Sequence, residues 1–65
     1  MDVTEIRDRV HEIRVCSDDP ESAHTLEDAL YLDALRAIAD GAENPDELAR
    51  EALLAAEIMF PRWCA

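Results

Sequence analysis

The chain has 65 residues, of which 16 are acidic and six basic, and its net charge at neutral pH is -10. This length suits a single small domain. Two cysteines allow at most one disulfide, which excludes a secreted disulfide framework. No apolar run approaches the roughly 20 residues of a membrane-spanning helix, and the N-terminus lacks the apolar stretch of a signal peptide. We therefore expect a cytoplasmic protein that does not associate with a membrane.

The first predicted element is a helix over about residues 3–15. Apolar residues recur there at steps of three and four, which places on one helical face Val3, Ile6, Val10 and Ile13. Asp2 and Glu5 have the spacing of a capping box, with Asp in place of the usual Ser or Thr. The charged residues on the other faces are typical of a solvated surface.

A second helix is predicted over about residues 22–40. Two starts are open: Asp19 can cap the helix with Pro20 in its first turn, or Thr25 can cap a shorter one. Apolar residues cover well over half of the circumference, namely Leu26, Leu30, Tyr31, Leu32, Leu35 and Ile38. In so short a chain, such a helix is central or contacts a second chain. Gly41 ends it as a left-handed residue.

A third helix is predicted over about residues 45–60. Asn44 is its expected cap, Pro45 suits the first turn, and Glu47 can complete a capping box. Its expected apolar face consists of Leu48, Ala52, Leu53, Ala56, Met59 and Phe60. Pro61 is expected to end the helix. Because the linker before it is short, the second and third helices should form an αα-hairpin.

These elements predict an all-α fold: one domain over residues 1–65, built as a small three-helix bundle with an αα-hairpin and a short C-terminal tail. If the helices run up, down and up, the tail emerges at an open end of the bundle, which a Trp side chain could cover. The wide apolar arc of the second helix also predicts a homodimer, through that helix or the C-terminal one. The residues assigned to oligomer contact or core capping are Leu32, Phe60 and Trp63.

The same topology gathers Cys16, His24 and Cys64 at one end. Zinc accepts thiolates and imidazoles, but neither Cys-x2-Cys nor His-x3-His spacing occurs, so these residues are weak candidates and no metal site is expected. A phosphate-binding loop is excluded because Gly occurs once. We expect no cofactor, no catalytic residues and no enzymatic activity.

Carboxylates crowd the loop before the second helix and its first turns, which we call the acidic end: Asp18, Asp19, Glu21, Glu27 and Asp28. They can cap the helix and keep the protein soluble, or dock a partner rich in Arg and Lys. The acidity can also reflect the organism, because all six basic residues are Arg, as in GC-rich coding, and a halophile would have a similar surface.

The stretch LDALRAIADGAENPDELAREAL resembles the first two helices of a helix-turn-helix or winged-helix domain, where an apolar helix ends in ADG and PDELA opens the next. That resemblance implies a following turn and a basic recognition helix. Here REALLAAEIMF is expected to continue as one apolar helix with a single Arg at its start, and a net charge of -10 repels phosphates. Nucleic acid is therefore not the expected partner, and a truncated helix-turn-helix regulator is the alternative function.

A second resemblance runs from DDPESAH through LEDALYLDALRAIADGA and LAREAL to RWCA. These stretches resemble small acidic proteins of unknown function from actinobacteria and their phages. The resemblance covers most of the chain and implies a cytoplasmic setting, which is the host cytoplasm for a phage protein, but no functional residues. The function we expect is a small acidic protein-interaction module, such as a phage or regulatory inhibitor, that binds a basic protein partner.

Overall fold

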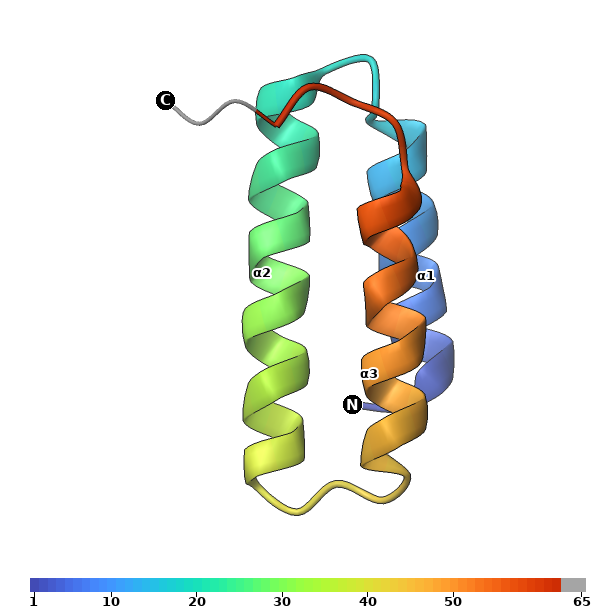
Figure 1. The fold of residues 1–65 in the computed structure, drawn as a ribbon, viewed down its shortest axis with the longest axis vertical. Helices are drawn as coiled ribbons and strands as arrows, with labels where there is room; N and C mark the ends of the chain where they lie inside the picture. The colour runs from blue at the N-terminus through green and yellow to red at the C-terminus, as the bar shows by residue number, and fades with distance from the viewer. Residues whose placement is uncertain (63–65) are drawn as a thin grey trace.

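Three α-helices and one short 3₁₀ helix make up residues 1–62, the part of the chain that the computed structural model describes. α1 spans Val3–Val15, α2 Pro20–Ala39, α3 Pro45–Leu53 and the 3₁₀ helix η1 Leu54–Glu57. The helices run up, down and up, and the segment after η1 crosses the end of the bundle toward the start of α2 (Figure 1). The predicted all-α bundle with an α2–α3 hairpin is confirmed.

The start of α2 settles the choice between its two predicted caps. Asp19 accepts hydrogen bonds from the backbone N–H of Ser22 at 3.4 Å and from its hydroxyl at 2.9 Å, and Pro20 lies in the first turn. Thr25, the other predicted cap, lies inside the helix. The Asp19 carboxylate therefore has a structural role, because it satisfies a donor that the helix itself leaves unpaired.

The α2–α3 loop depends on two residues with positive φ. Gly41 has φ +88°, and the N–H of Ala42 donates to the carbonyl of Ala37 at 3.0 Å, which closes α2 in a Schellman motif. Asn44 has φ 55° and ψ 51°, and its side chain makes no capping hydrogen bond. The capping box predicted with Glu47 is therefore wrong: a capping residue needs an extended conformation, whereas Asn44 is left-handed.

All three helices contribute to the core, which η1 and the segment after it complete. The predicted stripe of α1 is confirmed: Ile6 and Ile13 are fully buried, Val10 is buried, and Val3 packs against their edge. The other apolar residues of the core are Ala23, Leu30, Ala34, Leu48, Ala52, Ala55, Ile58 and Phe60. Many of these side chains are small, so the three helices enclose a thin core.

The third helix is shorter than predicted, because α geometry ends at Leu53 rather than near residue 60. Three residues predicted on its buried face are exposed instead: Leu53, Ala56 and Met59, the last by 90%. After η1 the chain is extended at Ile58 (φ -74°, ψ 127°), and this turns Ile58 and Phe60 into the core. Burial of these two side chains outweighs the helix propensity of the preceding alanines.

Candidate functional site

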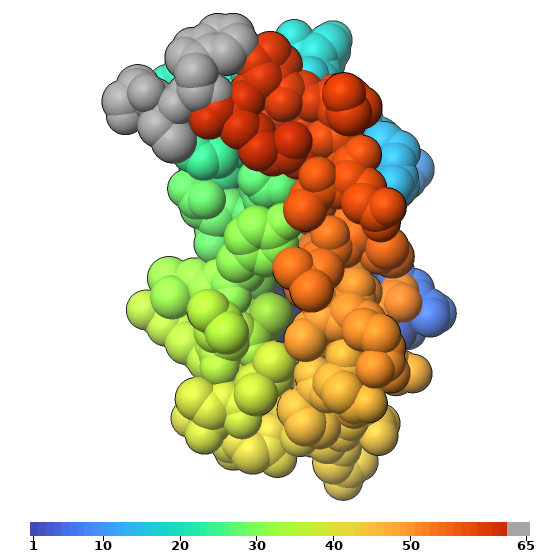
Figure 2. Space-filling view, in the orientation of Figure 1, coloured from blue at the N-terminus to red at the C-terminus, as the bar shows by residue number. Residues whose placement is uncertain are grey.

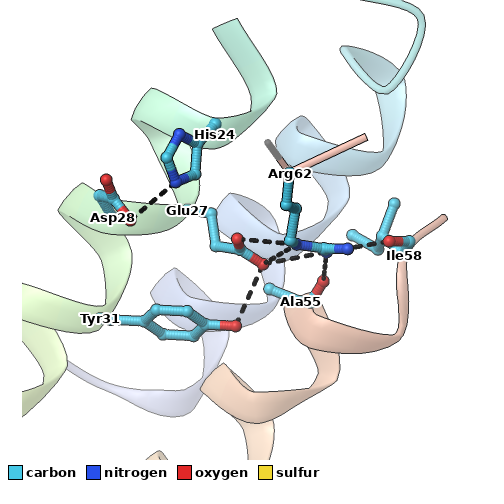
Figure 3. A network of polar contacts seen from close by, with 7 residues as sticks. All are labelled: His24, Glu27, Asp28, Tyr31, Ala55, Ile58 and Arg62. Atoms are coloured by element: carbon cyan, nitrogen blue, oxygen red, sulfur yellow. Dashed lines mark hydrogen bonds and ion pairs between the residues drawn. The ribbon is translucent and has the colours of Figure 1, made fainter. Parts of the chain in front are cut away.

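A buried ion pair joins the C-terminal segment to α2. Glu27 is only 3% exposed, and Arg62 donates to both of its carboxylate oxygens, from Nε to Oε1 at 3.0 Å and from Nη2 to Oε2 at 3.1 Å (Figure 3). Such a bidentate pair combines charge with a fixed geometry. It fixes the end of the described chain against α2.

Three further partners complete what we call the Arg62 network. Nη2 of Arg62 donates to the carbonyls of Ala55 and Ile58, each at 2.9 Å, and the guanidinium lies 3.9 Å from the centre of the Phe60 ring. The carbonyls come from η1 and the residue after it, so Arg62 stabilises the place where the helix was predicted to continue. A cation–π contact also covers the Phe60 side chain at the end of the core.

Tyr31 contacts the network from the next turn of α2. Its hydroxyl donates to Oε2 of Glu27 at 3.1 Å (Figure 3). Burial, followed by the negative charge of Glu27, raises the pKa of Tyr31 to about 12. The hydrogen bond to Glu27 likewise raises the pKa of Arg62 above its ordinary value. Both Glu27 oxygens are occupied by these partners, so the network holds the fold together and leaves this carboxylate no accessible site for a ligand.

One of the predicted site residues is therefore corrected. The sequence places Glu27 in the partner-binding acidic end, but Glu27 is buried and bound to Arg62. Phe60, predicted at an oligomer contact or a core cap, is buried at the end of the core, which agrees with the second of these two alternatives. Trp63, the other aromatic residue of the tail, lies outside the described residues.

The remaining carboxylates of the acidic end are exposed at one end of the bundle, in the α1–α2 loop and on α2: Asp18, Asp19, Glu21 and Asp28. Asp19 is occupied as the cap of α2, and the imidazole Nε2 of His24 lies 3.5 Å from Oδ1 of Asp28. Asp18 and Glu21 form no ion pair with any residue of the described chain. Their charges therefore face solvent.

Arginines neutralise little of this charge. Four of the six are paired with carboxylates: Arg7 with Glu51, Arg9 with Asp33, Arg50 with Asp46 and Arg62 with Glu27. None of these four carboxylates is among the exposed residues of the acidic end. The exposed carboxylates of the acidic end are therefore not paired with any Arg of residues 1–62.

Two of the weak metal candidates lie in the described chain. Cys16 is half-buried, and His24 contacts Asp28. Within residues 1–62, no group of three or more His, Cys, Asp or Glu side chains is arranged to hold a metal ion. Cys64 lies outside this range.

Several large apolar side chains of α2 and α3 are exposed. Leu35 is 65% exposed and Leu53, predicted on the buried face of the third helix, is 60% exposed; Leu32 is 48% exposed, which agrees with an oligomer contact rather than with a core cap. Sequence reasoning missed Leu35 and Leu53 as surface residues, and it missed Arg62 altogether. A signal for Glu27 was present, because its steps of four from Ala23 and three to Leu30 place it on the buried stripe of α2.

The comparisons with known proteins return no match: no family model, no curated protein and no solved structure is significantly similar to the chain. The two resemblances described from the sequence thus stay predictions. Within the described residues, no helix is long and apolar enough to cross a membrane.

Proposed function

We propose that this protein is a small acidic interaction module that binds a basic protein partner and catalyses no reaction. The observation that carries this proposal is the exposed charge at one end of the bundle, where Asp18 and Glu21 form no ion pair with any residue of 1–62 and Asp28 has only the His24 imidazole beside it. Clustered charge of one sign steers a partner of opposite sign and speeds its association. A setting in the cytoplasm, of the host if the protein is phage-encoded, belongs to the same proposal.

The alternative function, a truncated helix-turn-helix regulator, gains less support. A DNA-binding protein makes most of its affinity with phosphates through Arg and Lys. Here four of the six arginines are held by carboxylates of the same chain, and α3 is followed by η1 and an extended segment. Retention on DNA-cellulose rather than on a basic protein would favour this alternative.

A homodimer through α2 or the C-terminal segment remains a prediction. The exposure of Leu32 and Leu35 supports it, because burying them against a second copy would remove apolar surface from water. The net charge of -10 opposes it, since two copies repel each other. Self-association is therefore expected to be weak where this repulsion is not screened.

The test of the proposed function compares association rates over a range of ionic strength, using the basic protein that a pull-down from host lysate returns. The variant Asp18→Asn/Asp19→Asn/Glu21→Gln removes three charges, and Asn at 19 keeps a good helix cap. Its association should be much slower than that of the wild type at low salt. The difference should shrink above about 0.15 M, where the Debye length is about 8 Å.

A matched control removes three exposed charges elsewhere, in Asp8→Asn/Glu12→Gln/Glu43→Gln. This control has the same net charge as the test variant, so it separates a local effect from a global one. Identical salt dependence in the two variants would show that only net charge matters. Identical rates in wild type and both variants would refute the proposed function.

A further inference from the structure

Two ion pairs establish which sides of α2 and α3 face α1. Arg9 of α1 binds Asp33 of α2, with Nη1 2.9 Å from Oδ2. Arg7 of α1 binds Glu51 of α3, with Nε 2.7 Å from Oε1. Asp33 and Glu51 therefore mark the flanks of α2 and α3 that lie beside α1.

The opposite flanks of the two helices carry leucines. A residue two positions along a helix lies about 200° further around it. Leu35 is two positions after Asp33, and Leu53 is two positions after Glu51, so both lie away from α1, along the seam where α2 meets α3. Both are largely exposed.

Leu35 and Leu53 form the walls of what we call the α2–α3 groove. Half-buried residues one helical turn before each leucine, Tyr31 on α2 and Ala49 on α3, lie lower between the walls. Figure 2 looks onto this face, with α1 behind, and shows a hollow between the α2 and α3 side chains at mid-height.

Exposed carboxylates lie on both helices about one or two turns from the leucines of the groove. On α2, Asp28 lies one turn before Tyr31 and Leu32, and its side chain is 67% exposed. On α3, Asp46 lies one turn before Ala49, and Glu57 follows Leu53 by four residues in η1; both are exposed. The cation nearest to this wall along α3, Arg50, is bound to Asp46. The groove is thus lined by apolar side chains along its length and has three carboxylates at its rim, of which Asp46 is paired with Arg50 and Asp28 lies beside His24.

We propose that the α2–α3 groove binds an amphipathic helix of the basic partner, and this inference rests on the proposed function. A helix with apolar residues at i, i+4 and i+7 can lay them between two leucine walls. Lys and Arg on its flanks would meet Asp28, Asp46 and Glu57. A second copy of this chain is the poorer occupant, because it would bring the same carboxylates to the same rim.

The experiment uses the full chain labelled with ¹⁵N and three synthetic peptides of one length. The first is a Leu/Lys peptide with leucines at helical spacing. The second has the same composition in a scrambled order that no helix can arrange on one face, and the third carries Glu in place of Lys. We expect the first to bind at least about tenfold more tightly than the second, which is about 1.4 kcal/mol, and the third not to bind.

Amide chemical shifts then locate the binding. The first peptide should shift Tyr31, Leu35, Ala49 and Leu53. The variant Leu35→Ser/Leu53→Ser should lose the preference for the helical over the scrambled peptide. The matched control Val15→Ser/Leu54→Ser, which changes two exposed apolar residues outside the groove, should keep it. Both variants should fold, because all four side chains are exposed in the native state. Melting curves check this.

Several results would overturn the groove. Equal binding of the helical and scrambled peptides, or shifts confined to residues 17–28, would leave an acidic binding module without an apolar groove. A tight dimer that is insensitive to salt and buries Leu35 would show that a second copy of this chain, rather than a partner helix, occupies the groove. If no cationic peptide binds and the charge variants behave as wild type with the lysate partner, the proposed function fails together with the groove.

Discussion

Arg62 has more contacts to the rest of the fold than any other charged residue described above. Replacing it by Ala leaves the Glu27 carboxylate buried without its cation, and breaking a buried ion pair destabilises proteins by about 3–5 kcal/mol. We expect Arg62→Ala to lower the free energy of unfolding by about 3 kcal/mol, the lower end, because the Arg62 side chain is 33% exposed. Urea denaturation followed by circular dichroism measures this.

The control for this prediction is Arg50→Ala, which breaks the exposed pair of Arg50 and Asp46. Exposed pairs at this helical spacing contribute about 0.5 kcal/mol or less. Arg62→Lys should fall between, because an ammonium cannot reproduce the planar donor pattern that reaches a carboxylate and two carbonyls. Equal losses for the Ala variants at 50 and 62 would contradict the role assigned to the Arg62 network.

Tyr31 gives the fold a dependence on alkaline pH. Its pKa in the folded protein is about 12, above the ordinary value of 10. A raised pKa means that the folded state holds the proton more tightly, so this contribution to stability is complete below about pH 10 and is lost as the pH rises to about 12. Because Tyr31 is the only tyrosine, ultraviolet tyrosinate absorbance reports its titration alone.

In Tyr31→Phe, the fall in stability between about pH 10 and 12 should be smaller than in the wild type. Thermal melts at several alkaline pH values make the comparison. An ordinary tyrosinate titration in the folded protein, with midpoint near 10, would show that neither burial nor the Glu27 carboxylate acts on this hydroxyl.

For single residues, the sequence predicts helix caps and buried helical faces better than it predicts which distant side chains form ion pairs. The Asp2 cap, the Asp19 cap and the α1 stripe follow from local spacing, and all are observed. The role of Glu27 depends on Arg62, which is 35 residues away. A spacing of that length carries no periodic signal, so the acidic neighbourhood of Glu27 in the sequence indicated a surface residue.

At the scale of elements, the α2–α3 loop depends on the backbone freedom of Gly41. A Cβ at this position would meet no atom within 4 Å, so any effect of Gly41→Ala comes from its φ of +88°. A left-handed residue other than Gly is disfavoured by about 1–2 kcal/mol. We expect Gly41→Ala to lower the free energy of unfolding by that amount, as measured by chemical denaturation.

Asn44→Gly is the matched control in the same loop. Asn44 is already left-handed, and the greater freedom of Gly there is offset by the greater entropy of the unfolded chain. Its effect should therefore stay within about 0.5 kcal/mol. If Gly41→Ala were also this small, the Schellman closure of α2 would not depend on glycine.

The early end of α3 at Leu53 could not be predicted from the local sequence. The residues after Leu53 are good helix formers up to Pro61, and local propensity favours one continuous helix. The chain leaves the helix earlier because Ile58 and Phe60 are buried across the end of the bundle and Arg62 accommodates the freed carbonyls. These are tertiary contacts, which no local window contains.

For the whole molecule, the opposing effects of exposed leucines and net charge predict a self-association that grows with salt. Repulsion between two chains of charge -10 weakens as the Debye length shortens. Sedimentation velocity at micromolar concentration should show a larger dimer fraction in high salt than in low salt. Leu32→Asp, which adds a charge at a residue 48% exposed, should reduce that fraction. A dimer fraction that falls with added salt would contradict this prediction.

The fold class was predictable as a whole because Gly and Pro separate three clearly periodic segments. The exposure of Leu35 and Leu53 could not be predicted. A helical wheel assigns such apolar residues to a core, and only the packing of three short helices decides which side of α2 stays uncovered. Leu35 and Leu53 became surface residues in this way.

The Arg62 network also determines how the molecule opens. Its contacts join η1, the extended segment and α2, so loss of the guanidinium from Glu27 releases all of these segments together. Residues 54–62 should therefore behave as one cooperative unit in native-state hydrogen exchange, rather than fraying one residue at a time as chain ends usually do. Opening of this unit would expose Phe60 and a lone carboxylate while the three helices remain hydrogen-bonded.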